Sequence, residues 1–261
     1  MLEPETERPV AVRTRALTRK FGAFTAVDAL DLDVHEGEIF GFLGANGAGK
    51  TTTIKILCGL LLPTSGTGTV AGFDVLTRSE DIKRSIGYMS QRFSLYDDLS
   101  VRENLEFYAG LYGIGSRRLA RRLDELVPRL QLAEHLDKLT ASIPMGWKQR
   151  VALAAATVHD PAIVFLDEPT GGVDPVSRRA FWGLIDELAR SGKTVFVTTH
   201  YMDEAEYCHR ISVMNAGRII ALGSPADLKA QAGLETIQEL FLALVRRDER
   251  PGAGPQGGTS R

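Results

Sequence analysis

A glycine-rich octapeptide early in the chain combines the residue types that bind phosphate groups. It reads Gly44, Ala45, Asn46, Gly47, Ala48, Gly49, Lys50 and Thr51. Glycines let the backbone turn with its N–H groups directed inward, and the positive end of a following helix adds to the attraction for an anion. Lys50 would reach the β- and γ-phosphates of a nucleotide, Thr51 would bind Mg²⁺, and Thr52 would contact the α-phosphate. The octapeptide therefore predicts a P-loop.

Two carboxylates at the end of an apolar run form a second candidate element. Asp167 and Glu168 directly follow the run 163–166. A buried strand tolerates carboxylates at its end where a partner such as a metal ion balances them. Asp167 would hold Mg²⁺, commonly through water, and Glu168 would polarise the water that attacks the γ-phosphate. An isolated Asp-Glu pair is more often a solvated turn, and the preceding P-loop favours the catalytic interpretation.

The segments around these motifs alternate between strand-like and helix-like patterns. Apolar runs at 39–43, 163–166 and 195–197 are typical of parallel strands covered on both faces. A helical pattern begins near Lys50 and is stopped by Pro63. The order strand, glycine-rich turn, helix is the context that a P-loop requires. We therefore expect an α/β core built on a mostly parallel sheet.

Other segments predict an insert, a hairpin and a final helix. Residues 93–157 have helical patterns and no strand-like run, which indicates a helical insert. Apolar runs at 211–214 and 218–222 flank a short glycine-containing turn, as in a β-hairpin. Residues 236–245 combine capping-box spacing with one apolar helical face. Within the insert, a solvated helix face is expected for Arg117, Arg118, Arg121 and Arg122.

The composition excludes several classes of protein. The 261 residues include 44% hydrophobic and 25% charged residues, which fits one large globular domain. The formal net charge of −2 gives no strong general attraction to nucleic acid or anionic lipid. No apolar stretch approaches the length of a membrane-spanning helix and no signal peptide begins the chain, so we expect a cytosolic protein. Cys58 and Cys208 lack metal-ligand spacing and are expected to be buried, idle thiols.

The motifs together resemble those of the nucleotide-binding subunit of an ABC transporter, over the stretch from about Ala11 to Arg247. Phe21 matches the aromatic residue that stacks on the base, and Gln91 matches the Q-loop glutamine. Asp174 matches the D-loop aspartate, and His200 matches the switch histidine that contacts the γ-phosphate. The resemblance implies a P-loop NTPase domain over 10–247, with an N-terminal antiparallel β part and the helical insert. It also implies that the domain binds ATP and Mg²⁺. Residues 1–9 and 248–261 are expected to be a flexible N-terminus and a disordered tail.

The resemblance also assigns roles to these residues. Glu168, His200, Lys50 and Gln91 form the expected catalytic set. Gln91 would also join Thr51 and Asp167 as a ligand of Mg²⁺. Asp174 would contribute to nucleotide binding, as would Gly146 in the signature loop.

That signature loop departs from the family pattern. In place of Leu-Ser-Gly-Gly-Gln, the chain has Ile143, Pro144, Met145, Gly146 and Trp147. In the family, this loop caps the ATP held by the opposite subunit through its serine hydroxyl and glycine N–H groups. Pro144 offers neither a hydroxyl nor an N–H, and a lost hydrogen bond to a charged group typically costs about 1.5–3 kcal/mol. A smaller departure is Gly171, where the family often has serine.

Two interpretations of the departure are open. In the first, the loop is a working variant, since its pattern resembles a form seen in some exporter ATPases, and Gly146, the following backbone and the helix end bind the γ-phosphate. In the second, the loop is a degenerate half-site. A homodimer would then hydrolyse ATP slowly, or the chain would pair with a subunit that carries an intact signature.

The segments 94–113 and 235–247 look like those of exporters whose ATPase is a separate chain from the membrane permease. The resemblance implies that two subunits, identical or different, sandwich two ATP molecules at the inner face of the cell membrane. The permease would rest near Gln91. Usual cargoes are lipophilic drugs, antibiotics, ions or polysaccharides, and no nucleic acid partner is expected. The alternatives are a soluble ABC ATPase acting on ribosomes or nucleic acid, and a nucleotide-binding regulatory subunit with low turnover.

Overall fold

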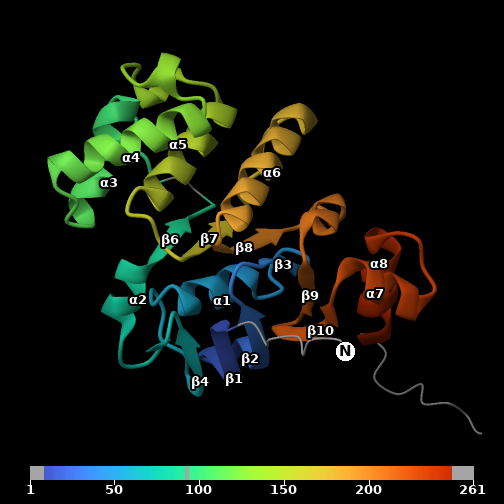
Figure 1. Cartoon of the computed structure of the whole chain (residues 1–261). Helices are drawn as coiled ribbons and strands as arrows, with labels where there is room; N and C mark the ends of the chain where they lie inside the picture. Colours follow the sequence, from blue (N-terminus) through green and yellow to red (C-terminus); the bar gives the residue numbers. More distant parts are fainter. Residues whose placement is uncertain (1–8, 92–93, 249–261) are drawn as a thin grey trace, which may run out of the picture.

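The structure is a computed structural model, and it describes residues 9–91 and 94–248. Within these residues, the chain forms two β-sheets with helices around them (Figure 1). The flexible segment predicted at 1–9 and the disordered tail predicted at 248–261 lie outside the described residues, apart from Pro9 and Asp248. Those two predictions therefore stay predictions.

The larger sheet has six strands in the order β10-β9-β3-β8-β7-β6. They are β3 (Ile39–Leu43), β6 (Ile86–Met89), β7 (Ile163–Asp167), β8 (Thr194–Thr199), β9 (Arg210–Asn215) and β10 (Arg218–Gly223). All neighbours pair in parallel except β10, which pairs antiparallel with β9. Every residue of β3, β7 and β8 is buried, which explains their apolar sequences. The predicted mostly parallel sheet and its hairpin are confirmed.

The smaller sheet is antiparallel and has the order β2-β1-β4-β5. Its strands are β1 (Val10–Phe21), β2 (Phe24–His35), β4 (Ser65–Val70) and β5 (Phe73–Asp74). Helix α1 (Lys50–Leu57) contacts β2, β4 and β7, so it lies between the two sheets, as Figure 1 shows. Residues of both sheets and of α1 share one hydrophobic core. The antiparallel β part that the resemblance implies is thus present.

A group of helices occupies the upper part of Figure 1. It consists of α3 (Val101–Leu111), α4 (Ser116–Arg129), α5 (Met145–Thr157) and the short 3₁₀ helices η1 (Ala133–His135) and η2 (Thr140–Ser142). Before it, α2 (Ser79–Ser85) precedes strand β6. A full capping box between Ser100 and Glu103 starts α3. The helical insert is confirmed for its described residues, and its core is continuous with one face of the larger sheet.

One of the four arginines predicted on a solvated helix face has another role. Arg117, Arg118 and Arg121 are exposed, but the side chain of Arg122 is only 16% exposed. Its guanidinium group donates to the carbonyl oxygens of Thr157 at 3.0 Å and of Val158 at 3.2 Å, at the end of α5. A cation stabilises the unpaired carbonyls at a helix C-terminus. The prediction was therefore wrong for Arg122, because the tertiary fold brings the end of α5 against α4.

The rest of the chain forms α6 (Pro175–Arg190), η3 (Met202–Tyr207), α7 (Pro225–Ala232) and α8 (Ile237–Asp248). The predicted capping box is confirmed, since Glu239 N donates to Thr236 Oγ1 and Thr236 N donates to Glu239 Oε2, each at 3.1 Å. Both cysteines are buried free thiols, as expected. In the described part of the chain, no helix is long and apolar enough to cross a membrane.

Candidate active site

The P-loop lies between β3 and α1, and its glycines are required by conformation and by space. Gly47 and Gly49 adopt positive φ angles of 83° and 106°, which side chains other than glycine rarely tolerate. A Cβ atom on Gly49 would lie 2.5 Å from the carbonyl oxygen of Ala26, and one on Gly44 would lie 2.6 Å from that of Met214. The loop is therefore closely packed on the strands around it, and α1 begins at Lys50 as predicted.

Lys50 is a buried cation at the start of α1. It is 4% exposed, and its Nζ atom donates to the carbonyl oxygens of Gly44 at 2.7 Å and Ala45 at 3.1 Å. The nearest carboxylate oxygen, Oε1 of Glu168, is 4.0 Å from Nζ. Burial lowers the pKa of Lys50, and the charges of Glu168 and Asp167 oppose this shift. A buried ammonium group with one distant carboxylate suits an anionic ligand such as a phosphate.

Asp167 ends strand β7 among hydroxyl groups. Its Oδ1 atom accepts from Thr198 Oγ1 at 2.6 Å and from Thr51 Oγ1 at 3.2 Å. Burial raises the pKa of Asp167, and so does the adjacent charge of Glu168, while the two hydroxyls and Lys50 lower it. The buried carboxylate would therefore be stabilised by a cation.

Glu168 is the point on which the predicted catalytic residues converge. Its Oε2 atom accepts from Gln91 Nε2 at 3.0 Å and lies 3.2 Å from His200 Nδ1. Its Oε1 atom lies 4.0 Å from Lys50 Nζ. The residue has a φ of 49°, an unusual value for a side chain other than glycine that costs on the order of 1–3 kcal/mol and that clusters at functional sites. We call Lys50, Gln91, Glu168 and His200 the Glu168 cluster.

The residues expected to bind Mg²⁺ also lie around this cluster. Thr51 and Asp167 are hydrogen-bonded to each other, and Gln91 contacts the adjacent Glu168. Among the described residues, no group of three or more His, Cys, Asp or Glu side chains could hold a metal ion by itself. A hydroxyl, one carboxylate and an amide oxygen nevertheless fit Mg²⁺, which takes few protein ligands and completes its shell with water and phosphate oxygens.

Phe21 lies outside the Glu168 cluster, at the end of β1. Its ring is 46% exposed, and the guanidinium carbon of Arg19 lies 4.5 Å from the ring centroid. Among the described residues, the ring contact of Phe21 is with Arg19 and not with the P-loop, so its role in binding the base stays a prediction. Thr52 is partly buried on α1, directly after Thr51.

Gly146 and Asp174 line a cavity that is separate from the Glu168 cluster. Both line a cavity of about 310 Å³, together with Pro144, Met145 and Ser177, which we call the signature cavity. Pro144 is the N-cap of α5 and makes no side-chain cap, while its carbonyl oxygen accepts from Trp147 N and Lys148 N. The N–H groups at the start of a helix have no intrahelical partner. Those of Met145 and Gly146 are therefore available to a ligand.

Asp174 is the N-cap of α6 as well as a lining residue of the signature cavity. Its carboxylate accepts from the hydroxyl of Ser177 at 2.6 Å and from the N–H groups of Val176 at 2.9 Å and Ser177 at 3.0 Å. The Ser177 hydroxyl is the main cause that lowers the pKa of Asp174. Capping α6 is thus a structural role of Asp174 that the sequence analysis did not assign.

Thr198 is the residue near the Glu168 cluster that the sequence analysis missed. Its hydroxyl donates to Asp167 Oδ1 at 2.6 Å and accepts from the N–H of Glu168 at 2.8 Å. From the neighbouring strand β8, it therefore holds the carboxylate of Asp167 and the backbone of Glu168. The available signal was a pair of threonines at the end of an apolar run, just before His200.

Comparisons with known proteins give independent evidence on the family. A family model described as ABC transporter matches residues 27–171. The probable multidrug ABC transporter ATP-binding protein YbhF of Escherichia coli (strain K12) is 45% identical over 245 residues, which cover 92% of this chain and 42% of YbhF. The daunorubicin resistance ATP-binding protein DrrA3 of Streptomyces coeruleorubidus is 40% identical over 228 residues, which cover 87% of this chain and 72% of DrrA3.

A solved structure shows the same likeness in three dimensions. It is a dimeric ATP-binding cassette in a post-hydrolysis state bound to ADP and Pi, with a TM-score of 0.74 and 26% identity over 82% of this chain and 98% of that one. This chain spans less than half the length of the Escherichia coli relative. The family model covers more than half of the chain, and both relatives are named as ATP-binding proteins. The chain therefore belongs to the ABC transporter family, as its P-loop, carboxylate pair and switch histidine predicted.

Proposed function

We propose that this chain is the ATP-hydrolysing subunit of an ABC exporter whose membrane permease is a separate chain. The observation that carries the proposal is the convergence of Lys50, Gln91 and His200 on Glu168, next to a P-loop. Relatives named as multidrug and daunorubicin resistance proteins favour export over an action on ribosomes or nucleic acid. A complete set of hydrolytic side chains likewise argues against a regulatory subunit with low turnover.

The proposed reaction transfers the γ-phosphoryl group of ATP to water. The P-loop N–H groups and Lys50 hold the phosphates and balance their charge. Glu168 orients the attacking water and accepts its proton, while Gln91 and His200 hold the Glu168 carboxylate in place. Thr51, Asp167 and Gln91 would hold Mg²⁺, which would supply positive charge at the phosphate oxygens. The low exposure of Glu168, 11% at its side chain, limits competing contacts with bulk water.

The proposed active unit contains two ATPase subunits. Gly146 and Asp174 line the signature cavity and have no contact with the Glu168 cluster that the structure describes. We propose that the signature cavity of one subunit closes on the nucleotide held by the other. The similar cassette bound to ADP and Pi is dimeric, which supports a unit of two subunits.

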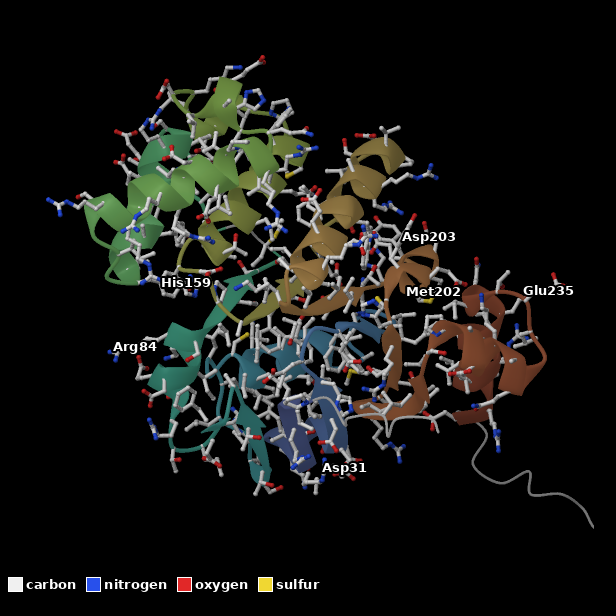
Figure 2. All side chains as sticks on the ribbon, viewed as in Figure 1. Asp31, Arg84, His159, Met202, Asp203 and Glu235 are labelled. Atoms are coloured by element: carbon white, nitrogen blue, oxygen red, sulfur yellow. The ribbon has the colours of Figure 1, made fainter. Side chains whose placement is uncertain are left out.

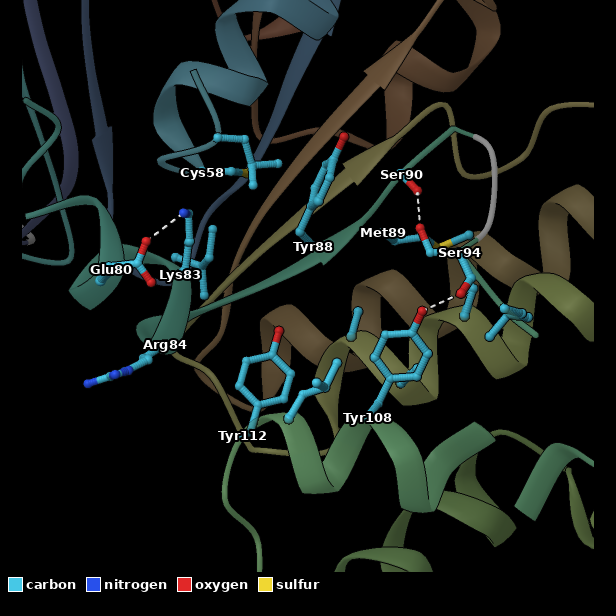
Figure 3. A pocket seen from close by; sticks show the side chains of 17 residues that line it. Cys58, Glu80, Lys83, Arg84, Tyr88, Met89, Ser90, Ser94, Tyr108 and Tyr112 are labelled. Atoms are coloured by element: carbon cyan, nitrogen blue, oxygen red, sulfur yellow. Dashed lines mark hydrogen bonds and ion pairs between the residues drawn. The ribbon is translucent and has the colours of Figure 1, made fainter. Parts of the chain in front are cut away.

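The proposed contact with the permease lies beside Gln91, at the inner face of the cell membrane. A cavity of about 480 Å³ opens there between α1, α2, β6, α3 and α5. Figure 3 shows Tyr88, Tyr108 and Tyr112 along it. Ser90, which precedes Gln91, lies 3.4 Å from the hydroxyl of Ser94, and the hydroxyl of Tyr108 donates to the carbonyl oxygen of Ser94. A permease segment seated there would act on Gln91 through these short contacts.

Substitution of the proposed base tests the function. We expect Glu168→Gln to lower ATP turnover at least about 100-fold, because an amide accepts no proton from water, while ATP binding persists. Steady-state turnover and the fraction of dimer in the presence of ATP are the measurements. Glu134→Gln, a change of an exposed glutamate on η1, is the matched control. Parent turnover in the Glu168 variant would show that the assigned base is wrong.

A further inference from the structure

A buried polar network near His200 consists of Thr170, Glu204 and Arg178, and none of the three has a role in the proposed reaction. Thr170 Oγ1 donates to Glu204 Oε1 at 2.5 Å, and Arg178 Nε lies 3.6 Å from the same oxygen. Glu204 is completely buried on η3, whereas Arg178 comes from α6. Glu204 Oε2 and Arg178 Nε have no hydrogen-bond partner among the described residues. Unpaired buried polar atoms cost about 1–3 kcal/mol each, so stability alone does not explain the network.

The network reaches His200 through an aromatic ring. The guanidinium carbon of Arg178 lies 3.8 Å from the ring centroid of Tyr201. The rings of Tyr201 and His200 are 4.2 Å apart between centroids. The Nδ1 atom of His200 in turn lies 3.2 Å from the Oε2 atom of Glu168. Side chains from α6, the turn after β8 and the end of β7 therefore form one row of contacts that ends at the proposed base.

The same row begins near the signature cavity. Arg178 N donates to the carbonyl oxygen of Asp174 at 3.0 Å, so Arg178 lies one helical turn after a residue that lines that cavity. Figure 2 labels Met202 and Asp203 at the start of η3, beside α6. Arg178 Nη1 lies 3.6 Å from Asp203 Oδ2, which confirms that the two elements are adjacent. Helix α6 thus connects the cavity to the surroundings of His200.

We infer that Arg178 is a positioning residue for His200, a role that rests on the proposed ATPase function. The guanidinium group holds the ring of Tyr201 by a cation–π contact, and that ring fixes the orientation of the imidazole. The carboxylate of Glu204, which accepts from Thr170, lies 3.6 Å from Arg178 Nε and attracts the guanidinium group in turn. Without this support, the 38% exposed side chain of His200 is free to turn its Nδ1 atom away from Glu168. Poor orientation of a catalytic set lowers the rate more than it lowers substrate affinity.

The test replaces Arg178 and a matched neighbour. Arg179 is the next residue on α6, exposed and outside the network. We expect Arg178→Gln to lower kcat about tenfold with KM for ATP within twofold, and Arg179→Gln to leave both within twofold. Arg178→Lys keeps the charge over the ring and is expected to recover part of the lost rate. An unchanged kcat in Arg178→Gln overturns the inference.

A second measurement does not depend on turnover. The imidazole C–H signal of His200 in an NMR spectrum, assigned with a His200→Gln variant, reports the surroundings of the ring. Arg178→Gln is expected to displace this signal, although Arg178 does not itself contact the imidazole. The displacement should vanish in a Tyr201→Leu background, since the connecting ring is then absent.

These two measurements separate the possible failures. A parent chain without turnover contradicts the proposed function, yet the NMR comparison still tests the positioning role. A lower melting temperature and lower kcat in Arg178→Gln, with an unmoved His200 signal, would show a purely structural role and overturn the inference.

Discussion

The Glu168 cluster and the signature cavity differ in how much of their chemistry one chain supplies. In the cluster, three side chains from different parts of the chain meet around the carboxylate of Glu168, with Oε2 contacts of 3.0 and 3.2 Å. In the signature cavity, Pro144 is the N-cap of α5 and makes no side-chain cap bond, so the donors at the start of this helix are backbone N–H groups, and Arg150 also lines the cavity. On the proposed function, one chain supplies every side chain of the cluster, whereas the cavity would act only against a nucleotide held by a second subunit.

The largest expected effect tests the completeness of the cluster. We expect Lys50→Met to weaken ATP binding at least about 100-fold, because it removes charged hydrogen bonds to two phosphates, each typically worth about 1.5–3 kcal/mol. Titration of a fluorescent ATP analogue measures the affinity. The matched control is Lys55→Met, which changes an exposed lysine on the same helix. Parent affinity in Lys50→Met would show that the P-loop binds nucleotide without its lysine.

A substitution in the signature cavity should have an intermediate effect. A Cβ atom on Gly146 would lie 3.5 Å from Ser177 Oγ, an ordinary contact, so the single chain has room for alanine. Alanine also favours a helix by up to about 1 kcal/mol over glycine. We therefore expect Gly146→Ala to retain its melting temperature and to lose about tenfold in turnover, because the added methyl group obstructs a nucleotide arriving from a second subunit.

The control for this change is another helical glycine. Gly183→Ala places a methyl group in open space on the exposed face of α6 and should leave turnover unaffected. Equal turnover of the Gly146 and Gly183 variants would mean that nothing approaches Gly146 during the reaction. The signature cavity would then have no part in hydrolysis.

The two regions also differ in how well the sequence predicted them. The P-loop, the carboxylate pair and the strands that carry them were predictable, because local motifs and apolar runs determine them. Gln91 entered the predicted site only through resemblance to a family, and its contact with Glu168, 77 positions away in the chain, was not predicted. The roles of Arg122 and Thr198 were not predicted, because they depend on tertiary contacts. The fold brings the end of α5 beside Arg122 and the end of β7 beside Thr198. The role of Asp174 as a helix cap could have been predicted from local sequence, because proline follows it and favours the first position of a helix.

The smallest expected effect decides between the two interpretations of the signature loop. Pro144→Ser supplies the hydroxyl that the family uses, and the extended conformation at this N-cap, with ψ of 156°, suits serine. We expect turnover within twofold of the parent, because the N–H groups of Met145 and Gly146 already supply donors at the start of α5. Pro144→Ala, which has no hydroxyl, is the control, and serine should exceed it in stability by about 1 kcal/mol through capping. A tenfold or greater rise in turnover with serine alone would instead identify the loop as a degenerate half-site, because only the hydroxyl distinguishes the two variants in the site.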